Sequence, residues 1–451
     1  MTDTIDGGSP TDDAPVPSDG ARFADRDTIF GDAPEGVDIW QRVPYDPDDY
    51  GPVQDYATDF DHGHPDYNQR APDVWKELRE SGCPVAHSDR YGGMWVPITH
   101  ETVHEVAYDT ENFTSRDVVV SVGRPGDLAL PAPIGGAPPI TSDPPFHAMA
   151  RRLLLPPFAP KQIEPWEGKV RELCGRLLDD MGEITPGETV IDAAVQYAQH
   201  IPVNVIGQML GFPEEDEELF RRFVHDALER ITEEPGTREG MDDLGKYIAA
   251  QIQDHRENPR DDLTSYLMNV ELDGNKLSDE HVGGSIVLLL IAGIDTTWSA
   301  IGSSLWHLAQ HPEHRLRLVD DPEVMTFALE EFLRAYAPVT MARMVAKDHE
   351  FHGCPMKQDD WVLLPFPAAN RDPEQFEDAD GFVIDREQNR HAAFGLGIHR
   401  CLGSNLARLE LKVAIEEFVR RFPHFELAGD VRWSVGQIRG PRELPVRVLT
   451  W

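Results

Sequence analysis

The segment from Phe394 to Gly403, which reads FGLGIHRCLG, contains the residue best suited to chemistry, Cys401. Gly395 and Gly397 predict a tight loop that a flat ligand could approach closely. A helix is expected to begin at the cysteine, so the sulfur would face unpaired backbone amides and the positive end of the helix dipole, which both stabilise a thiolate. The other cysteines lie in no such pattern and are interpreted as inert: Cys83, Cys174 and Cys354.

This segment resembles the haem-binding signature of the cytochrome P450 family. All fixed positions of that signature, F-G-x-G-x-H-x-C-x-G, are filled, and the likeness extends over most of residues 70–451. The resemblance implies that Cys401 is the axial thiolate of haem iron, where it donates electron density that favours cleavage of the O–O bond. It also implies haem b (iron protoporphyrin IX) as the cofactor, with Phe394, Gly395 and Gly403 around it.

A second motif of the family lies in a strongly apolar stretch, where Ala292 to Thr297 read AGIDTT and match A-G-x-[DE]-T. Glycine inside a helix costs about 1 kcal/mol relative to alanine, and a buried Asp or Thr is costly unless it is paired. Residues that destabilise a helix in this way indicate a functional role. The resemblance implies that Ala292 lies at the haem, that Thr296 donates a hydrogen bond to bound oxygen and that Asp295 relays protons.

The two propionates of haem need cations or hydrogen-bond donors around them. His147 and Arg151 are four residues apart, on one face of a predicted helix, and match the family's H-x-x-x-R motif. Arg343 and His399 occupy the other two positions at which the resemblance implies propionate ligands. Any one of these residues could be an ordinary solvated side chain, but the four together predict a haem site.

A structural network is expected around Glu331 and Arg334, which form the family's E-x-x-R motif. Three residues apart on a helix, they can form an ion pair. The resemblance implies that the pair is buried and anchors the loop that carries the cysteine. The arginine expected as the third member is missing, because Gly381 stands in its place, and Arg371 or Arg386 is the candidate to replace it.

These motifs predict a haem-thiolate monooxygenase that inserts one atom of O2 into a C–H bond of a small apolar or aromatic molecule, by hydroxylation or oxidative O-dealkylation. The pocket residues that the resemblance implies are apolar: Leu288, Ile291, Ala292, Val339 and Met341. The sequence has no flavin or nicotinamide motif, so electrons are expected from a ferredoxin or flavodoxin with its NAD(P)H-dependent reductase. An acidic partner would dock on a cluster of cations: Arg151, Arg152, Arg400, Arg408 and Lys412.

Three alternatives remain open from the sequence. A peroxide-driven peroxygenase of the same fold would lack the Asp–Thr pair, and a haem-binding sensor or carrier would need no proton relay. A thiol enzyme without haem would pair Cys401 with a base, for which His399 is close in the sequence.

The resemblance implies the cytochrome P450 fold, which is mainly α with small β-sheets, a triangular helix-rich prism around a long central helix and the haem. The spacing of apolar residues along the chain likewise predicts mostly helices with a few strands. Ser278 is a good N-cap, and the helix that it begins is predicted to reach Gln310, before Pro312. Other helices are predicted at 71–81, 100–107, 160–181, 193–210, 214–231, 238–257 and 323–336 and after Cys401, strands at 92–98 and within 343–366, and a long loop at 118–141.

The 451 residues include 41 Lys and Arg against 80 Asp and Glu, a net charge of −39, which disfavours nucleic acid and anionic membranes as partners. No signal peptide is visible, and the longest apolar run, residues 286–294, is shorter than the roughly 20 residues of a membrane helix. The four cysteines have no paired spacing, so no disulfides and a cytoplasmic protein are expected. Residues 1–38 are predicted to be a disordered acidic extension, and residues 39–451 a single monooxygenase domain.

Overall fold

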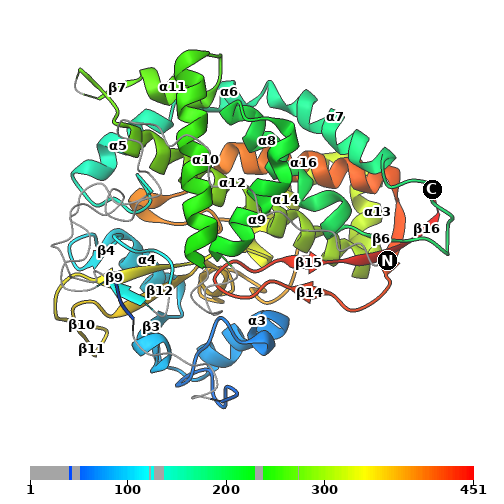
Figure 1. Ribbon diagram of the computed structural model, residues 1–451. Helices are drawn as coiled ribbons and strands as arrows, with labels where there is room; N and C mark the ends of the chain where they lie inside the picture. Colours follow the sequence, from blue (N-terminus) through cyan, green and yellow to red (C-terminus); the bar gives the residue numbers. More distant parts are fainter. Residues whose placement is uncertain are drawn as a thin grey trace, which may run out of the picture.

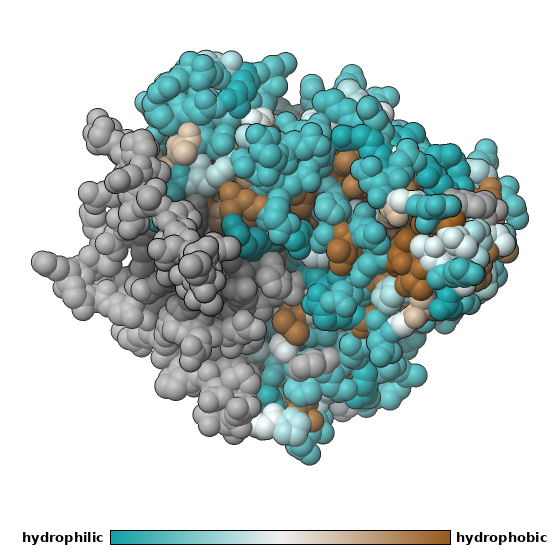
Figure 2. Space-filling view, turned by 45° about the vertical axis from the view of Figure 1, so that its right-hand side comes forward, coloured by the Kyte–Doolittle hydropathy of each residue, from teal (hydrophilic) through white to brown (hydrophobic). Residues whose placement is uncertain are grey.

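The computed structural model describes residues 40–42, 51–120, 123–125, 137–228, 237–272 and 274–450. Helices dominate one side of the molecule, and the largest sheet lies with α3 and α4 on the other (Figure 1). Hydrophilic residues cover most of the described surface in Figure 2, and hydrophobic ones gather in patches between them. The predicted extension at 1–38 and most of the predicted loop at 118–141 lie outside the described residues.

The central element is α12 (Asp279–Gln310), which begins as predicted at Ser278, whose hydroxyl accepts a hydrogen bond from the backbone amide of His281. Its apolar residues are buried because other helices pack around it: α8 (His200–Leu210), α9 (Glu217–Leu228), α10 (Thr237–Glu257), α11 (Leu263–Asn269), α14 (Met325–Ala335) and α16 (Ser404–Arg421). α12 is long and apolar enough to cross a membrane, but 72% of its most apolar window is buried inside the protein. It is therefore the core helix.

The remaining helices are α3 (Pro65–Glu80), α4 (His100–Tyr108), α5 (Phe146–Leu154), α6 (Pro160–Ile163), α7 (Trp166–Asp179), α13 (Pro312–Asp320) and α15 (Phe366–Ala369). The helix predicted at 160–181 is two helices, because Pro165 has no N–H to donate to the preceding turn. The helix predicted at 71–81 begins earlier, at Pro65, with His64 as its cap. α13 was not predicted, because Pro312 ends one helix and also begins the next.

The largest sheet has the strand order β2-β3-β12-β9-β4: β2 (Val85–Ser88), β3 (Met94–Pro97), β4 (Phe113–Thr114), β9 (Thr340–Val345) and β12 (Trp361–Pro365). β12 is parallel to β3 and antiparallel to β9. A second sheet and a hairpin involve the C-terminal strands: β6 (Val190–Asp192), β13 (His424–Leu427), β14 (Arg432–Trp433), β15 (Pro441–Glu443) and β16 (Pro445–Thr450). Short pairs join β1 (Trp40–Arg42) to β5 (Gly123–Pro125), β7 (Glu271–Leu272) to β8 (Asn275–Lys276) and β10 (His349–Phe351) to β11 (Cys354–Met356).

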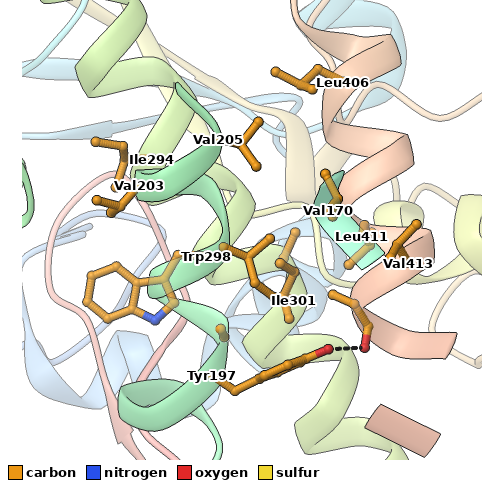
Figure 3. Close-up of a cluster of buried hydrophobic side chains, with 14 of the residues drawn as sticks. Val170, Tyr197, Val203, Val205, Ile294, Trp298, Ile301, Leu406, Leu411 and Val413 are labelled. Atoms are coloured by element: carbon orange, nitrogen blue, oxygen red, sulfur yellow. Dashed lines mark hydrogen bonds between the residues drawn. The ribbon is translucent and has the colours of Figure 1, made fainter. Parts of the chain in front are cut away.

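The core cluster between α8, α12 and α16 fixes α16 against α12 (Figure 3). Ile294 and Ile301 of α12 and Val413 of α16 are fully buried in it. Burial of each such side chain contributes about 1.5–3 kcal/mol. The hydroxyl of Tyr197 adds a buried hydrogen bond of 2.8 Å to the carbonyl of Ala414. The cysteine loop, which leads into α16, is thereby held at a fixed place relative to the central helix.

Candidate active site

Cys401 lies in a loop that leads into α16. The sequence predicted that the helix begins at the cysteine. It begins instead at Ser404, with Gly403 as its N-cap, so the cysteine precedes the helix. Gly397 in this loop has a φ of +68°, and a Cβ there would collide with the carbonyl of Ala107. Only glycine fits that position, so the loop is held close to α4.

The sulfur of Cys401 has an unusual environment. Its side chain is exposed, yet the protein atoms beside it desolvate the thiol and raise its pKa. The backbone amide of Gly403 and the charges of Arg151, Arg408 and Arg400 act in the opposite direction. A thiol with these partners would release its proton to solvent on binding a metal ion, because a coordinating thiol is deprotonated outright.

The cysteine loop is supported by Arg408 of α16, which was predicted to belong to the docking face, and by its partner Glu330 of α14. The backbone amide of Cys401 donates to the carbonyl of Phe394 at 2.7 Å. The guanidinium of Arg408 lies 4.3 Å from the centre of the Phe394 ring and donates to both carboxylate oxygens of Glu330, at 2.6 and 2.8 Å. His391 binds the same carboxylate at 3.0 Å. Arg408 is therefore a structural support rather than a free surface cation.

The four predicted propionate ligands are brought together. The rings of His147 and His399 lie edge to face with their centres 4.3 Å apart, and the Ser115 hydroxyl lies 2.9 Å from Nε2 of His399. Desolvation, followed by the charges of Arg343, His147 and Arg151, lowers the pKa of His399 to about 2. Desolvation lowers the pKa of buried Arg343 to about 10. The cluster therefore has a positive potential that favours anions.

This cluster fits the haem that the sequence motif implies. Among the described residues, no hydrogen-bond partner is found for the buried Nε2 of His147. Arg343, which is 5% exposed, donates to the carbonyl of its neighbour Ala342 at 2.7 Å. Buried polar atoms and cations are costly unless an acceptor or an anion meets them. Two propionate groups would supply both the acceptors and the negative charge.

One face of α12 is left open in a helix that is otherwise buried. Leu288, Ile291 and Thr296 are partly exposed and Ala292 is exposed, at spacings that place them on one side of the helix. The hydroxyl of Thr296 donates to the carbonyl of Ala292 at 2.7 Å. The other two predicted pocket residues are also partly exposed, Val339 just before β9 and Met341 on that strand. None of these five predicted pocket residues is fully buried.

Asp295 is held by a residue that the sequence analysis missed. It is 2% exposed and forms a buried ion pair of 2.7 Å with Arg442 of β15. The same guanidinium donates to the Ser299 hydroxyl at 3.1 Å and lies over the ring of Trp298. A Cβ at Gly440 would collide with Ser299, so only glycine lets this segment approach α12 closely enough. No local pattern could have revealed a pair between residues so far apart in the chain.

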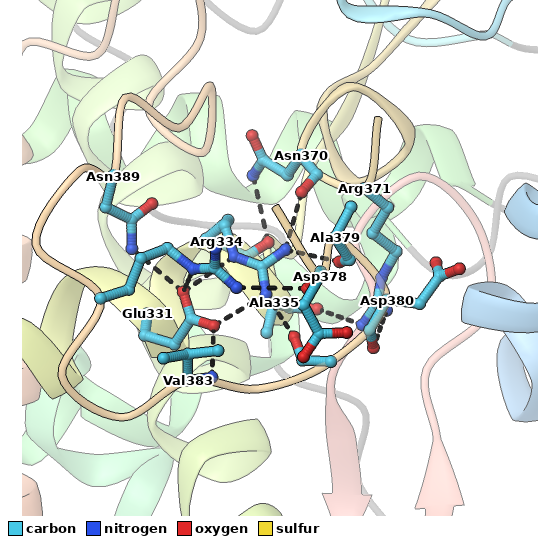
Figure 4. A network of polar contacts seen from close by, with 12 residues as sticks. Glu331, Arg334, Ala335, Asn370, Arg371, Asp378, Ala379, Asp380, Val383 and Asn389 are labelled. Atoms are coloured by element: carbon cyan, nitrogen blue, oxygen red, sulfur yellow. Dashed lines mark hydrogen bonds and ion pairs between the residues drawn. The ribbon is translucent and has the colours of Figure 1, made fainter. Parts of the chain in front are cut away.

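The E-x-x-R pair lies in a network of polar contacts (Figure 4) and is buried, as predicted. Glu331 and Arg334 are both fully buried and joined by two hydrogen bonds of 2.8 Å. Burial opposes ionisation of Glu331, but its contacts with Arg334, the Val383 amide and Arg386 outweigh it and lower the carboxyl pKa. Of the two replacement candidates, Arg386 contacts Glu331, at 2.9 Å, whereas Arg371 donates to two backbone carbonyls. Arg386 therefore takes the place of the missing arginine.

The backbone at position 381 takes over part of the role of the missing arginine. A Cβ at Gly381 would meet the carboxylate of Asp378, so a larger side chain would require that carboxylate to move. The carbonyl of Gly381 instead accepts a hydrogen bond from Arg334, as does that of Ala379 at 2.7 Å. The contact that the family makes with a side chain is made here with the backbone and with Arg386.

Comparisons with known proteins show the family to which the chain is related. The family model described as Cytochrome P450 matches residues 236–433. The chain is 35% identical to the polyketide biosynthesis cytochrome P450 PksS of Bacillus subtilis over 316 residues, which are 68% of this chain and 76% of that protein. It is 32% identical to cytochrome P450-terp of a Pseudomonas species over 404 residues, which are 83% of this chain and 92% of that protein.

The solved structures extend the likeness to the fold. The structure of CYP109E1 from Bacillus megaterium in complex with testosterone has a TM-score of 0.77 and 29% sequence identity, and the match covers 86% of this chain and 100% of that one. The thiol loop, the cationic cluster beside it and these relatives lead to one conclusion. The chain belongs to the cytochrome P450 family of haem-thiolate monooxygenases, which bind haem b.

Proposed function

We propose that this protein hydroxylates or oxidatively O-dealkylates a small apolar or aromatic molecule, with Cys401 as the thiolate ligand of its haem. The observation that carries this proposal is the thiol of Cys401 beside the charges of Arg151, Arg400 and Arg408, near a cluster in which the buried Nε2 of His147 has no hydrogen-bond partner among the described residues. When bound, haem supplies the activation of O2 and the oxidation of the C–H bond. The domain that does this would span residues 39–451.

The protein's own residues bind, orient and insulate. His147, Arg151, Arg343 and His399 would hold the propionates, and the Phe394 ring, itself fixed by Arg408, would shield the cysteine loop from water. Electrons delivered to such a site yield hydrogen peroxide instead of product unless each electron is accompanied by a proton. Proton delivery therefore belongs to Asp295 and Thr296 on α12.

In the proposed relay, Asp295 takes up a proton at its carboxylate and Thr296 passes it on through its hydroxyl. Arg442 would hold the carboxylate of Asp295 in place, because its guanidinium forms a buried ion pair of 2.7 Å with it. The Thr296 hydroxyl, now donating to the carbonyl of Ala292, remains able to accept a proton at its oxygen. Arg442 is in this scheme a positioning residue for the relay.

Thr296→Ala should lower the product formed per electron consumed by about tenfold and raise hydrogen peroxide correspondingly, because proton delivery of this kind contributes a factor of 10² or more. Thr297→Ala is the matched control, since Thr297 is buried beside it on the same helix and has no assigned role. Product, peroxide and reductant consumption are measured together. Equal coupling in the two variants would contradict the relay.

The absorption spectrum of the reduced carbon monoxide complex tests the thiolate itself. The wild-type protein should give the spectrum of a thiolate-ligated haem, and Cys401→Ser should lose it while retaining the fold by circular dichroism. Cys83→Ser, at an exposed cysteine remote in sequence, should leave the spectrum unchanged. A histidine-like spectrum in the wild-type protein would reject the assignment.

The substrate class rests on the open face of α12 and on β9. Leu288, Ile291, Ala292, Val339 and Met341 are all apolar and incompletely buried, which favours an apolar ligand. The relatives point to different molecules, since one is named for polyketide biosynthesis and another is bound to testosterone. A titration of the haem spin state with aromatic ethers, terpenes, fatty acids and steroids would identify the class, and no response to any of them would reject an apolar substrate.

The proposed electron donor is an acidic ferredoxin or flavodoxin, reduced by an NAD(P)H-dependent reductase. Of the predicted docking cations, Arg152 and Arg400 are exposed. Arg408 is bound to Glu330, and Lys412 lies 3.9 Å from both Glu167 and Glu416. Arg152 and Arg400 therefore remain the docking residues that we propose, and the charge of Arg400 acts on the Cys401 thiol. A cytoplasmic location is consistent with four free cysteines and a core-buried α12.

A further inference from the structure

Three histidines converge where α12 ends and α13 begins. His307 is in the last turn of α12, His311 joins the two helices and His314 is in α13. The ring centre of His307 lies 4.2 Å from that of His311 and 5.1 Å from that of His314. One ring nitrogen of each residue lies within 4.8 Å of the other two. Three converging imidazoles are a donor set for borderline divalent metal ions.

The surroundings of the cluster orient its most buried member. His307 is 1% exposed, and its Nδ1 lies 2.6 Å from the hydroxyl of Tyr336. That contact leaves Nε2 of His307 to face the cluster, 2.9 Å from Nδ1 of His314. Metal-binding histidines are typically fixed in this way, by a partner on the other ring nitrogen.

We propose that His307, His311 and His314 bind one Zn²⁺ ion. Ligand nitrogens in a tetrahedral zinc site are about 3.3 Å apart. The pair formed by His307 and His314 is already closer than this, and the side chain of His311 is 44% exposed and so can move inward. The fourth position is open to water or to Glu313, whose carboxylate lies 3.2 Å from Nδ1 of His311.

A zinc ion here would join segments that support the haem site. It would tie the end of α12 to the start of α13, and His307 would extend the link to Tyr336 at the end of α14. The ring of Phe382, which follows Gly381, lies 4.0 Å from the ring of His307 and packs on the same cluster. The zinc site would thus be structural: it would connect the ends of α12, α13 and α14 near the E-x-x-R network and would take no part in the reaction at the haem.

Zinc binding is tested on the full-length, haem-loaded protein without a histidine tag. The protein is treated with EDTA, dialysed against ZnCl2 and analysed for zinc and iron by mass spectrometry. We expect one zinc per iron and a rise of several degrees in the thermal midpoint, because a ligand that binds only the folded state stabilises it. The zinc-edge X-ray absorption spectrum should show three imidazole ligands.

His311→Asn and His314→Asn are the informative variants, because both side chains are partly exposed and their loss leaves the core intact. Each should weaken zinc binding at least tenfold and abolish the thermal shift. His104→Asn is the control, since His104 is exposed on α4 with His100 one turn away. Zinc that persists in both test variants, or that is lost in the control, overturns the proposal, as does a wild-type protein that binds no zinc.

Discussion

Glutamine in place of Glu331 should cost the folded protein about 3–5 kcal/mol, the loss expected when one partner of a buried ion pair is removed. Glu331 is fully buried and accepts hydrogen bonds from Arg334, Arg386, the Val383 amide and Asn389. The variant would leave two buried guanidinium groups facing a neutral amide. Because those groups hold the chain before the cysteine loop, we also expect poor haem retention.

The adjacent residue provides the control for this experiment. Glu330 has a side chain that is 27% exposed, and it binds Arg408 and His391. Glu330→Gln should cost about 1 kcal/mol, as is typical of partly exposed pairs. The thermal midpoint is compared between the two variants, and haem content per chain is measured for Glu331→Gln alone, because Glu330 also supports the cysteine loop through Arg408. Similar losses in the two variants would show that burial of the E-x-x-R glutamate carries no special weight.

The second large effect concerns Glu410, a buried carboxyl in the middle of α16. It is 2% exposed, its Oε2 has no hydrogen-bond partner among the described residues, and desolvation raises its pKa to about 8. The folded protein therefore keeps a proton here that the unfolded chain loses above its ordinary pKa of 4.5. Stability falls as the pH rises from about 4.5 to about 8, by about 3 kcal/mol at pH 7.

Glu410→Gln should remove this dependence, because glutamine resembles the protonated acid. The variant should be more stable than the wild-type protein at pH 7–8, by up to about 3 kcal/mol at pH 7, and nearly equal to it near pH 5. Thermal midpoints between pH 5 and pH 8 measure the difference. A difference that does not change with pH would mean that Glu410 is ionised in the folded protein.

Glu417, two turns further along α16, is the matched control, because its pKa is shifted in the opposite direction to that of Glu410. Its carboxylate pairs with Arg171 at 2.7 Å and with Arg420. Burial raises its pKa, but these two arginines outweigh burial and lower it. Its contribution to stability is therefore present above its unfolded pKa and is lost as the pH falls. Glu417→Gln should destabilise the protein at neutral pH and have less effect in acid.

The parts of the fold that could be predicted from the sequence depend on local patterns. The N-cap at Ser278 and the apolar residues after it predicted α12 within a residue at its start, because both signals act within one segment. The spacing of His147 and Arg151 placed them on one helix face, α5, in the same way. Pro165 is a local signal for the break between α6 and α7, but the continuous apolar pattern on both sides of it predicted one helix.

The parts of the site that could not be predicted depend on contacts between distant segments. Arg442 reaches Asp295 only because β15 packs on α12. The support of Phe394 by Arg408 requires Glu330 from a third element. The choice of Arg386 over Arg371 depends on the path of the backbone around Gly381, which the sequence does not specify. Proximity of this kind follows from the tertiary structure, and one sequence does not contain it in any pattern.

Arg334 and Arg386 hold the segment 370–381 largely through its main-chain carbonyls. Arg334 binds the carbonyls of Asn370, Ala379 and Gly381, and Arg386 binds those of Glu377 and Asp378. Every amino acid carries the same carbonyl group, so such contacts place little demand on residue type. The segment should therefore keep its course when its own exposed side chains are replaced, whereas replacing either arginine should alter it.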